Sequence, residues 1–295
     1  MSVSHSGGVF LSARLRKMVA FLSAACVFAL ARAYMLYKFM EKNGCDANVY
    51  YIADEYAGYS YGFAAAVIIW LAVSAVYCLR SFRKMRPVIP LGRVFSALGC
   101  LVMGSSLLLS ALFYIISLFN DGKAYSAGLS SLEAAVVVLA VAAAAVFLFH
   151  GVRCCLGARR ISGTIAAASV LPMALLSAVR VLADFVRSGS GPLASSGGYH
   201  ILGLCAAMLW FIFEGKAYLG GGNAVAAFFF GSSAIVLLLI YAVPDLLLCC
   251  TGQLTLDRYA VFSIVDVTTA AYISARLLTA RCRERQKALP GVQTE

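Results

Sequence analysis

The residues that could do chemistry in this chain are a few charged side chains inside long apolar segments. In the segment LPMALLSAVRVLADF, at 171–185, Arg180 and Asp184 are four residues apart and share one face if the segment is helical. Charges inside a membrane are costly, so they usually face the protein interior, where they pair with one another or mark a binding site or proton pathway. The candidate substrate-binding residues of this kind are Arg32, Glu133, Arg180, Asp184 and Asp266.

Depth within the membrane predicts which of these charges can meet. A helix rises about 1.5 Å per residue, which puts Arg32, Arg180 and Asp266 roughly 8–12 Å inside the outer boundary. Glu133 and Asp184 lie closer to that boundary. Pairing among them is therefore geometrically possible, and the internal duplication described below would pair Arg32 with Glu133 and Arg180 with Asp266. Two interpretations stay open: a binding site or proton or ion relay that opens outward, and static ion pairs that fix helix register while the shallow charges snorkel.

Long apolar runs supply the elements that must position these residues. The 295 residues are 62% apolar and 13% charged, with a mean hydropathy of +0.88, far outside the range of soluble proteins. A helix needs about 20 apolar residues to cross the hydrocarbon, and no run shows the alternation of an outer-membrane barrel. We predict an all-α polytopic integral membrane protein with about eight transmembrane helices, at 18–37, 62–79, 95–118, 129–150, 163–185, 199–215, 223–243 and 259–279.

Glycine, proline and charge predict where these helices bend or end. Residues 38–61 are predicted as a loop, and the three glycines at 220–222 as a tight connection. Pro172 is expected to kink its span, and Pro244 to end the seventh span with Asp245 at the outer boundary. Small residues at 142–145, 166–169 and 231–233 suit close helix packing. Ordinary inner-face charges are expected at Glu214, Lys216 and Arg276.

The distribution of basic residues predicts the orientation of the protein in the membrane. Of the 24 Lys and Arg residues, 17 fall in the N-terminal tail, the loops after the second, fourth and sixth spans, and the C-terminal flank, against five on the opposite side. Cytoplasmic segments carry such an excess, so both termini are predicted to be cytoplasmic, and the net charge of +11 does not indicate nucleic-acid binding. The predicted parts are an N-terminal tail (1–17), a first four-helix unit (18–150), a basic linker (151–162), a second four-helix unit (163–279) and a basic-polar tail (280–295).

Features recur in the same order in the two four-helix units. Gly-Ser-Ser followed by tyrosine occurs at 104–114 and at 231–241, and the two tryptophans lie in the second and sixth spans. Such an order predicts a tandem duplication whose parallel copies are related by a pseudo-twofold axis along the membrane normal. The alternative is a chance likeness between apolar helices rich in small residues.

Two features have alternative interpretations. The basic start and the first apolar run also fit a cleavable signal peptide, although the apolar character continues through 34–37 and favours a retained span. Most of the ten cysteines are expected to act as small apolar residues. A disulfide among Cys45, Cys249 and Cys250 would form if that side of the membrane is oxidising.

Sequence motifs for catalysis or cofactors are absent. The chain has no GxxxxGK[ST], GxGxxG, HExxH or GxSxG, and its three histidines, His5, His150 and His200, are far apart in sequence. We expect no cofactor and no metal. An enzyme is unsupported.

The second half of the chain resembles uncharacterised multi-span membrane proteins of Gram-positive anaerobic bacteria. The residues that carry the resemblance are LPMALLSAVRVLADF, LGLCAAMLWFIFEGKAYLGG and LLLIYAVPDLLL, about one third of the chain. The resemblance implies a bacterial plasma membrane and no activity.

The leading hypothesis is a transporter, or a transport-associated component, for a small molecule or ion. The alternatives are a membrane scaffold or sensor subunit with structural ion pairs and, third, a lipid-modifying enzyme. Beyond lipid and cargo, the sequence identifies no partner.

Overall fold

The computed structural model describes residues 23–38, 54–83, 85–88, 94–121, 127–156, 162–188, 197–252 and 260–284. Within these ranges seven helical segments are long and apolar enough to cross a membrane. Six are single helices: α2 (Asp54–Phe82), α3 (Val94–Asp121), α4 (Ala127–Cys155), α7 (Gly197–Tyr218), α8 (Ala224–Cys250) and α9 (Ala260–Thr279). The seventh combines α5 (Gly163–Ser169) with α6 (Leu171–Ser188). The prediction of a polytopic helical membrane protein is therefore confirmed. A further helix covers 23–38, and part of the predicted first span lies outside the described residues.

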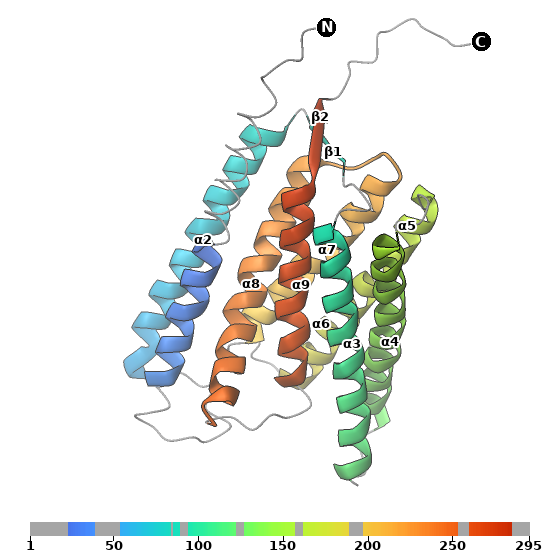
Figure 1. The fold of residues 1–295 in the computed structure, drawn as a ribbon. Coiled ribbons are helices and arrows are strands. Elements are labelled where there is room, and N and C mark those ends of the chain that lie inside the picture. The colour runs from blue at the N-terminus through green and yellow to red at the C-terminus, as the bar shows by residue number, and fades with distance from the viewer. Residues whose placement is uncertain are drawn as a thin grey trace, which may run out of the picture.

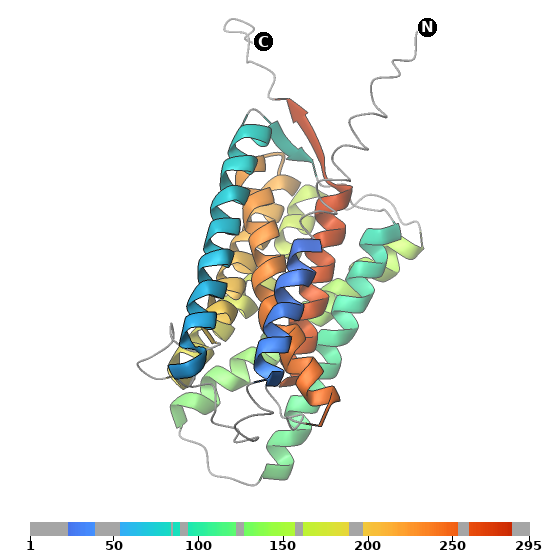
Figure 2. The ribbon, with the colours of Figure 1, turned by 90° about the vertical axis from the view of Figure 1, so that its left-hand side faces the viewer.

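The helices form one bundle around α8 and α9 (Figures 1 and 2). In their apolar 18-residue stretches, α8 and α9 are each 61% buried inside the protein, whereas α2 is 17% buried. Helix α8 packs along α7 and α9, helix α3 packs along α4 and α9, and α6 packs on α7 and α4. At the edge, α2 packs on α8, and the helix at 23–38 contacts α2 through Phe28, whose ring centroid lies 5.9 Å from that of Phe63. The faces of these helices that pack against one another are where polar groups can be buried.

Two predicted helix ends are wrong. Helix α2 begins at Asp54, so part of the predicted loop at 38–61 is helical. Helix α8 continues through Pro244 to Cys250. In a membrane, neighbouring helices and side chains can compensate the backbone hydrogen bond that an internal proline removes, so proline does not have to end the helix. Asp245 is consequently buried within α8 and is not a boundary residue.

The segment at 163–188 is broken at Val170, between α5 and α6. Val170 caps α5 and Pro172 follows in the first turn of α6, where the missing proline N–H has no intrahelical acceptor to lose. The Ser169 hydroxyl donates to the Ala166 carbonyl at 2.7 Å and supports the last turn of α5. The kink predicted from Pro172 is therefore present as a break between two helices.

Close helix contacts depend on small residues. A Cβ placed on Gly231 of α8 would lie 2.7 Å from the Trp210 ring of α7, and one on Gly104 would lie 2.8 Å from Leu148. Ala143, Ala144 and Ala166 are buried, as predicted for the small-residue segments. The glycine connection between α7 and α8 is also confirmed, since Gly220 and Gly222 have φ values of 74° and 108°.

A short antiparallel ribbon, absent from the prediction, joins two basic segments. Strand β1 (Met85–Val88) follows α2 and pairs with β2 (Arg281–Glu284), which follows α9. The pairing places the end of α2 and the end of α9 at the same end of the bundle (Figure 1). The loop after the second span and the C-terminal flank therefore lie together, as the distribution of basic residues predicts.

The helix contacts do not support a symmetric duplication. Helix α7 packs along α8, whereas its predicted counterpart α2 packs on α8, and α2 with α3 is not among the main contacts of the described helices. Helix α3 packs on α9, but the equivalent pair, α8 with α4, is not among the main contacts of the described helices. The four-helix repeat stays a prediction from the sequence.

Candidate functional site

Four polar side chains meet toward the end of the bundle away from the β1–β2 ribbon, and we call Arg180, Asp184, His200 and Asp266 the outer network, after the orientation that the basic residues predict. Arg180 and Asp184 lie one turn apart on α6, His200 is in the first turn of α7, and Asp266 is in α9. The packing of α6 on α7 and the common contacts with α8 bring these three helices together. The buried members are Arg180, His200 and Asp266, while the Asp184 side chain is 19% exposed.

A bidentate pair of hydrogen bonds joins Arg180 to Asp266. Arg180 Nη1 donates to Asp266 Oδ1 at 2.6 Å, and Nη2 donates to Oδ2 at 3.0 Å. This fork geometry is the strongest form of an arginine–carboxylate hydrogen bond. The pair that the sequence predicted is therefore present. The Phe262 ring covers the guanidinium, with 5.0 Å from Cζ to the ring centroid.

His200 lies between the two carboxylates. Its Nδ1 is 2.7 Å from Asp184 Oδ2, and its Nε2 is 2.9 Å from Asp266 Oδ2. Its Nε2 is also 3.1 Å from Arg180 Nη2. The imidazole stacks on the Tyr241 ring of α8, with 4.0 Å between ring centroids, which fixes the ring plane. A single ring therefore contacts both acids and the arginine.

These contacts satisfy His200 in two protonation states. Carboxylates only accept hydrogen bonds and a guanidinium only donates them. As an imidazolium, His200 donates from Nε2 to Asp266 and forms an ion pair with Asp184 through Nδ1. As a neutral ring protonated at Nδ1, it keeps the contact with Asp184 and accepts from Arg180 at Nε2. A buried ring nitrogen without a partner would cost about 1–3 kcal/mol, and neither state carries that penalty.

Other polar groups lie next to the outer network. The Ser263 hydroxyl of α9 donates to Asp245 Oδ2 of α8 at 3.3 Å. Arg32, from the helix at 23–38, lies over the Tyr199 ring with 4.5 Å from Cζ to the centroid. Because Tyr199 precedes His200 in α7, Arg32 belongs to the surroundings of the outer network. Glu133 is buried in α4. The pairing of Arg32 with Glu133 stays a prediction.

A second polar group lies toward the other end of α7 and α9, and we call Glu214, Tyr218, Tyr272 and Arg276 the inner clamp. Arg276 Nε donates to Glu214 Oε1 at 2.8 Å. The hydroxyls of Tyr218 and Tyr272 donate to the same oxygen at 2.8 and 3.2 Å. Arg276 also donates to the Tyr218 hydroxyl. Glu214 is fully buried and Arg276 is 1% exposed, so the expectation of ordinary surface charges is wrong for both residues.

Sequence reasoning found part of the site and missed its centre. It identified Arg180, Asp184 and Asp266, which the structure brings together, but it did not include His200. The available signal was depth, since His200 opens its span in the same leaflet as Arg180 and Asp266. Within the described residues no group of three or more His, Cys, Asp or Glu could hold a metal ion. Of the cysteines considered for a disulfide, Cys250 is a free thiol, and Cys45 lies outside the described residues.

The seven apolar helices and the buried charges define a multi-pass α-helical membrane protein. No family model, curated protein or solved structure matches the chain, so its function has to be argued from the site.

Proposed function

We propose that this protein is a proton-coupled membrane transporter for a small molecule or ion, in which His200 binds and releases the proton. The supporting observation is that His200 Nε2 lies within hydrogen-bond distance of both an acceptor, Asp266 Oδ2 at 2.9 Å, and a donor, Arg180 Nη2 at 3.1 Å. A purely structural histidine needs one hydrogen-bond pattern. This one has a partner for each of two patterns, and histidine titrates in the physiological range more readily than any other side chain.

Charge supports the same proposal. With a neutral imidazole, Arg180 and the two ionised carboxylates of the outer network sum to one negative charge, and protonation of His200 brings the sum to zero. In a low-dielectric interior such a change alters the interaction with any nearby ion by several kcal/mol. Proton binding can therefore compete with the binding of a cationic cargo, or it can be coupled to a conformational change. The partly exposed Asp184 gives the network a contact with the outer surface.

The proposal includes eight spans with both termini on the cytoplasmic side of a bacterial plasma membrane. It is supported by the distribution of basic residues, by the helix at 23–38, and by the ribbon that joins the segments after α2 and α9. In this orientation the outer network faces away from the cytoplasm and the inner clamp faces toward it.

A structural clasp is the second candidate function, and one observation favours it. Arg180 and Asp266 are almost fully buried and pair through two hydrogen bonds, as expected for charges that only fix the position of α6 on α9. A scaffold or sensor subunit would need no more than this pair. It would not need a histidine that contacts both acids.

A pH jump on protein reconstituted in a solid-supported membrane separates the two candidates. We expect the wild-type protein to give a transient current from proton binding and His200→Gln to lose it, because glutamine can donate and accept without gaining charge. His5→Gln, in the N-terminal tail, controls for the loss of a histidine, and gel filtration checks that each variant is monodisperse. No current above that of protein-free membranes would support the clasp. An unchanged current in His200→Gln would exclude His200 as the proton-binding group.

A further inference from the structure

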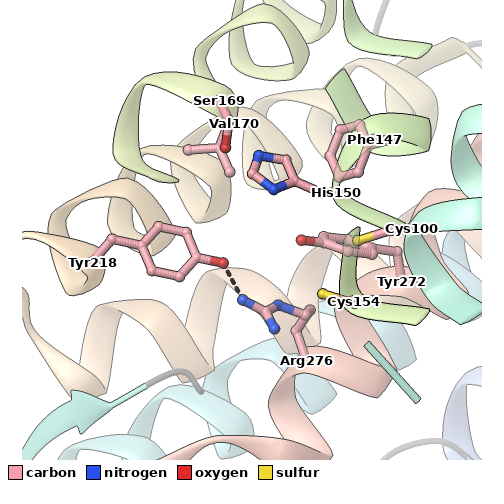
Figure 3. Close-up of a pocket in the computed structure, with 9 residues that line it drawn as sticks. All are labelled: Cys100, Phe147, His150, Cys154, Ser169, Val170, Tyr218, Tyr272 and Arg276. Atoms are coloured by element: carbon pink, nitrogen blue, oxygen red, sulfur yellow. Dashed lines mark hydrogen bonds between the residues drawn. The ribbon is translucent and has the colours of Figure 1, made fainter. Parts of the chain in front are cut away.

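A cavity lies on the basic side of the bundle, next to the inner clamp (Figure 3). Its volume is about 20 Å³. Its wall includes the buried residues His150 and Arg276, and its rim includes the half-buried residues Cys154, Ser169 and Tyr218. A cavity of this volume has room for about one water molecule, and it is too small for a transported solute.

His150 gives this cavity a polar group without a partner. The residue is 8% exposed, and among the described residues its Nδ1 has no hydrogen-bond partner. Figure 3 shows the imidazole facing the cavity between Ser169, Tyr218 and Tyr272. A buried ring nitrogen with no partner costs about 1–3 kcal/mol. A water hydrogen-bonded to Nδ1 would remove this cost, and the hydroxyl and guanidinium groups around the cavity supply its other partners.

The charges around His150 come from three helices. Arg153 lies one turn further along α4, Arg276 comes from α9, and Glu214 comes from α7. Arg276 is paired with Glu214, and Arg153 adds a second positive charge near His150. The uncharged titratable groups that face the cavity are Cys100, Cys154, Tyr218 and Tyr272. The field of Arg153 repels a proton on His150, which suits brief exchange of a proton and not its storage.

We infer that the cavity holds one water molecule hydrogen-bonded to His150 and that this pair exchanges protons with the basic side of the membrane. The imidazole takes a proton on Nδ1 from a hydronium ion, which is left as water, and returns the proton to water by the reverse step. The inference rests on the proposed function, since it supplies the inner exchange group for a protein whose outer group is His200. The two histidines lie toward opposite ends of the bundle, because His200 is in the first turn of α7 and His150 is near the end of α4 that precedes the basic linker.

Histidine-selective NMR tests the water site directly. The chain has three histidines, so 15N-histidine-labelled protein in liposomes gives a spectrum that His150→Gln and His5→Gln assign. We expect the His150 signal to receive magnetisation from water. Cys154→Met should fill the cavity and remove this transfer, while Cys155→Met, at the exposed neighbouring position, should leave it unchanged. A His150 signal without water transfer, or one that Cys154→Met does not alter, would overturn the water site.

The pH-jump measurement tests the exchange role. With jumps applied to the basic side, His150→Gln and Cys154→Met should reduce the current, while Cys155→Met should match the wild type. If His200→Gln abolishes the current and His150→Gln has no effect from either side, the inner-exchange role is wrong and the proposed function stands. If His200→Gln changes nothing while water still reaches His150, the proposed function is wrong, the exchange role falls with it, and the water site alone remains.

Discussion

The outer network and the inner clamp use the same two helices, α7 and α9, in different ways. Each contains an arginine–carboxylate pair with 2.6 or 2.8 Å between nitrogen and oxygen. In the outer network the third partner is His200, which can carry either zero or one positive charge. In the inner clamp the further partners are two tyrosine hydroxyls that donate to one oxygen of Glu214. Under the proposed function the outer pair is coupled to a proton, whereas the inner pair is supported by donors that stay neutral at physiological pH.

The difference teaches that burial alone does not show what an intramembrane ion pair does. Both pairs are almost fully buried, so both pay a desolvation cost, and either could be a structural clasp. The distinguishing property is whether a neighbouring group can supply a charge when one partner of the pair is removed. His200 can do so for Arg180, but no neutral hydroxyl can do so for Arg276. Substitutions in the two centres should therefore have unequal effects on stability.

The largest effect is expected for Arg276→Leu in the inner clamp. The change leaves the charge of Glu214 buried with only two hydroxyl donors, and breaking a buried pair in this way costs about 3–5 kcal/mol. Unfolding by sodium dodecyl sulfate in mixed micelles measures the loss. Arg83→Leu, an exposed arginine just after α2, is the matched control and should change stability by less than about 0.5 kcal/mol. Similar values for the two variants would contradict the clamp.

A smaller effect is expected for Arg180→Gln in the outer network. Asp266 then keeps His200, which as an imidazolium supplies a positive charge 2.9 Å away. The cost should be about 1.5–3 kcal/mol, as for hydrogen bonds to a charged group, and unfolding in mixed micelles again measures it. Combining this change with His200→Gln should cost more than the sum of the two single changes, because the compensating group is lost. A cost equal to that of Arg276→Leu would show that His200 does not compensate.

The outer pair could be predicted from the sequence because opposite charges at the same depth have few alternative partners. Arg180 and Asp266 were such charges, and the cost of leaving either one alone in hydrocarbon made their pairing the expected outcome. The helices themselves were also predictable, because backbone N–H and C=O groups in lipid must form hydrogen bonds within their own segment. The break between α5 and α6 followed from Pro172.

The rest could not be read from the sequence because it depends on how helices pack. His200 is one uncharged side chain at the start of a span, and only the contact of α6 with α7 places it between two acids. Glu214 and Arg276 lie near helix ends, where charges are usually exposed, and their burial follows from the packing of α7 and α9 on α8. The continuation of α8 past Pro244 depends on neighbours that support the helix, and hydropathy does not contain them.

Glycine substitutions compare the packing around the two centres. A Cβ on Gly231 would meet Trp210, a fully buried ring beside the inner clamp, at 2.7 Å. A Cβ on Gly203, nearer the outer network, would meet Leu238 at 3.1 Å. Gly231→Ala should therefore cost about 1–3 kcal/mol, and Gly203→Ala less, because the added Cβ would crowd its neighbours less at 3.1 Å than at 2.7 Å. Thermal unfolding followed by tryptophan fluorescence measures both. The reverse order would mean that the inner half is the looser one.

The smallest effect is expected for Asp245→Asn, beside the outer network. Asparagine keeps a carbonyl oxygen that can accept from the Ser263 hydroxyl, and that hydrogen bond is already long at 3.3 Å. Removing the charge also removes the cost of burying it, so stability should change by less than about 0.5 kcal/mol. If His200 responds to the field of the whole outer half, the same change should alter its 15N signal, since Asp245 is one of the carboxylates whose charge acts on His200. An unaltered His200 signal would restrict the groups that act on His200 to the other members of the outer network. An altered signal would add Asp245 of α8 to them.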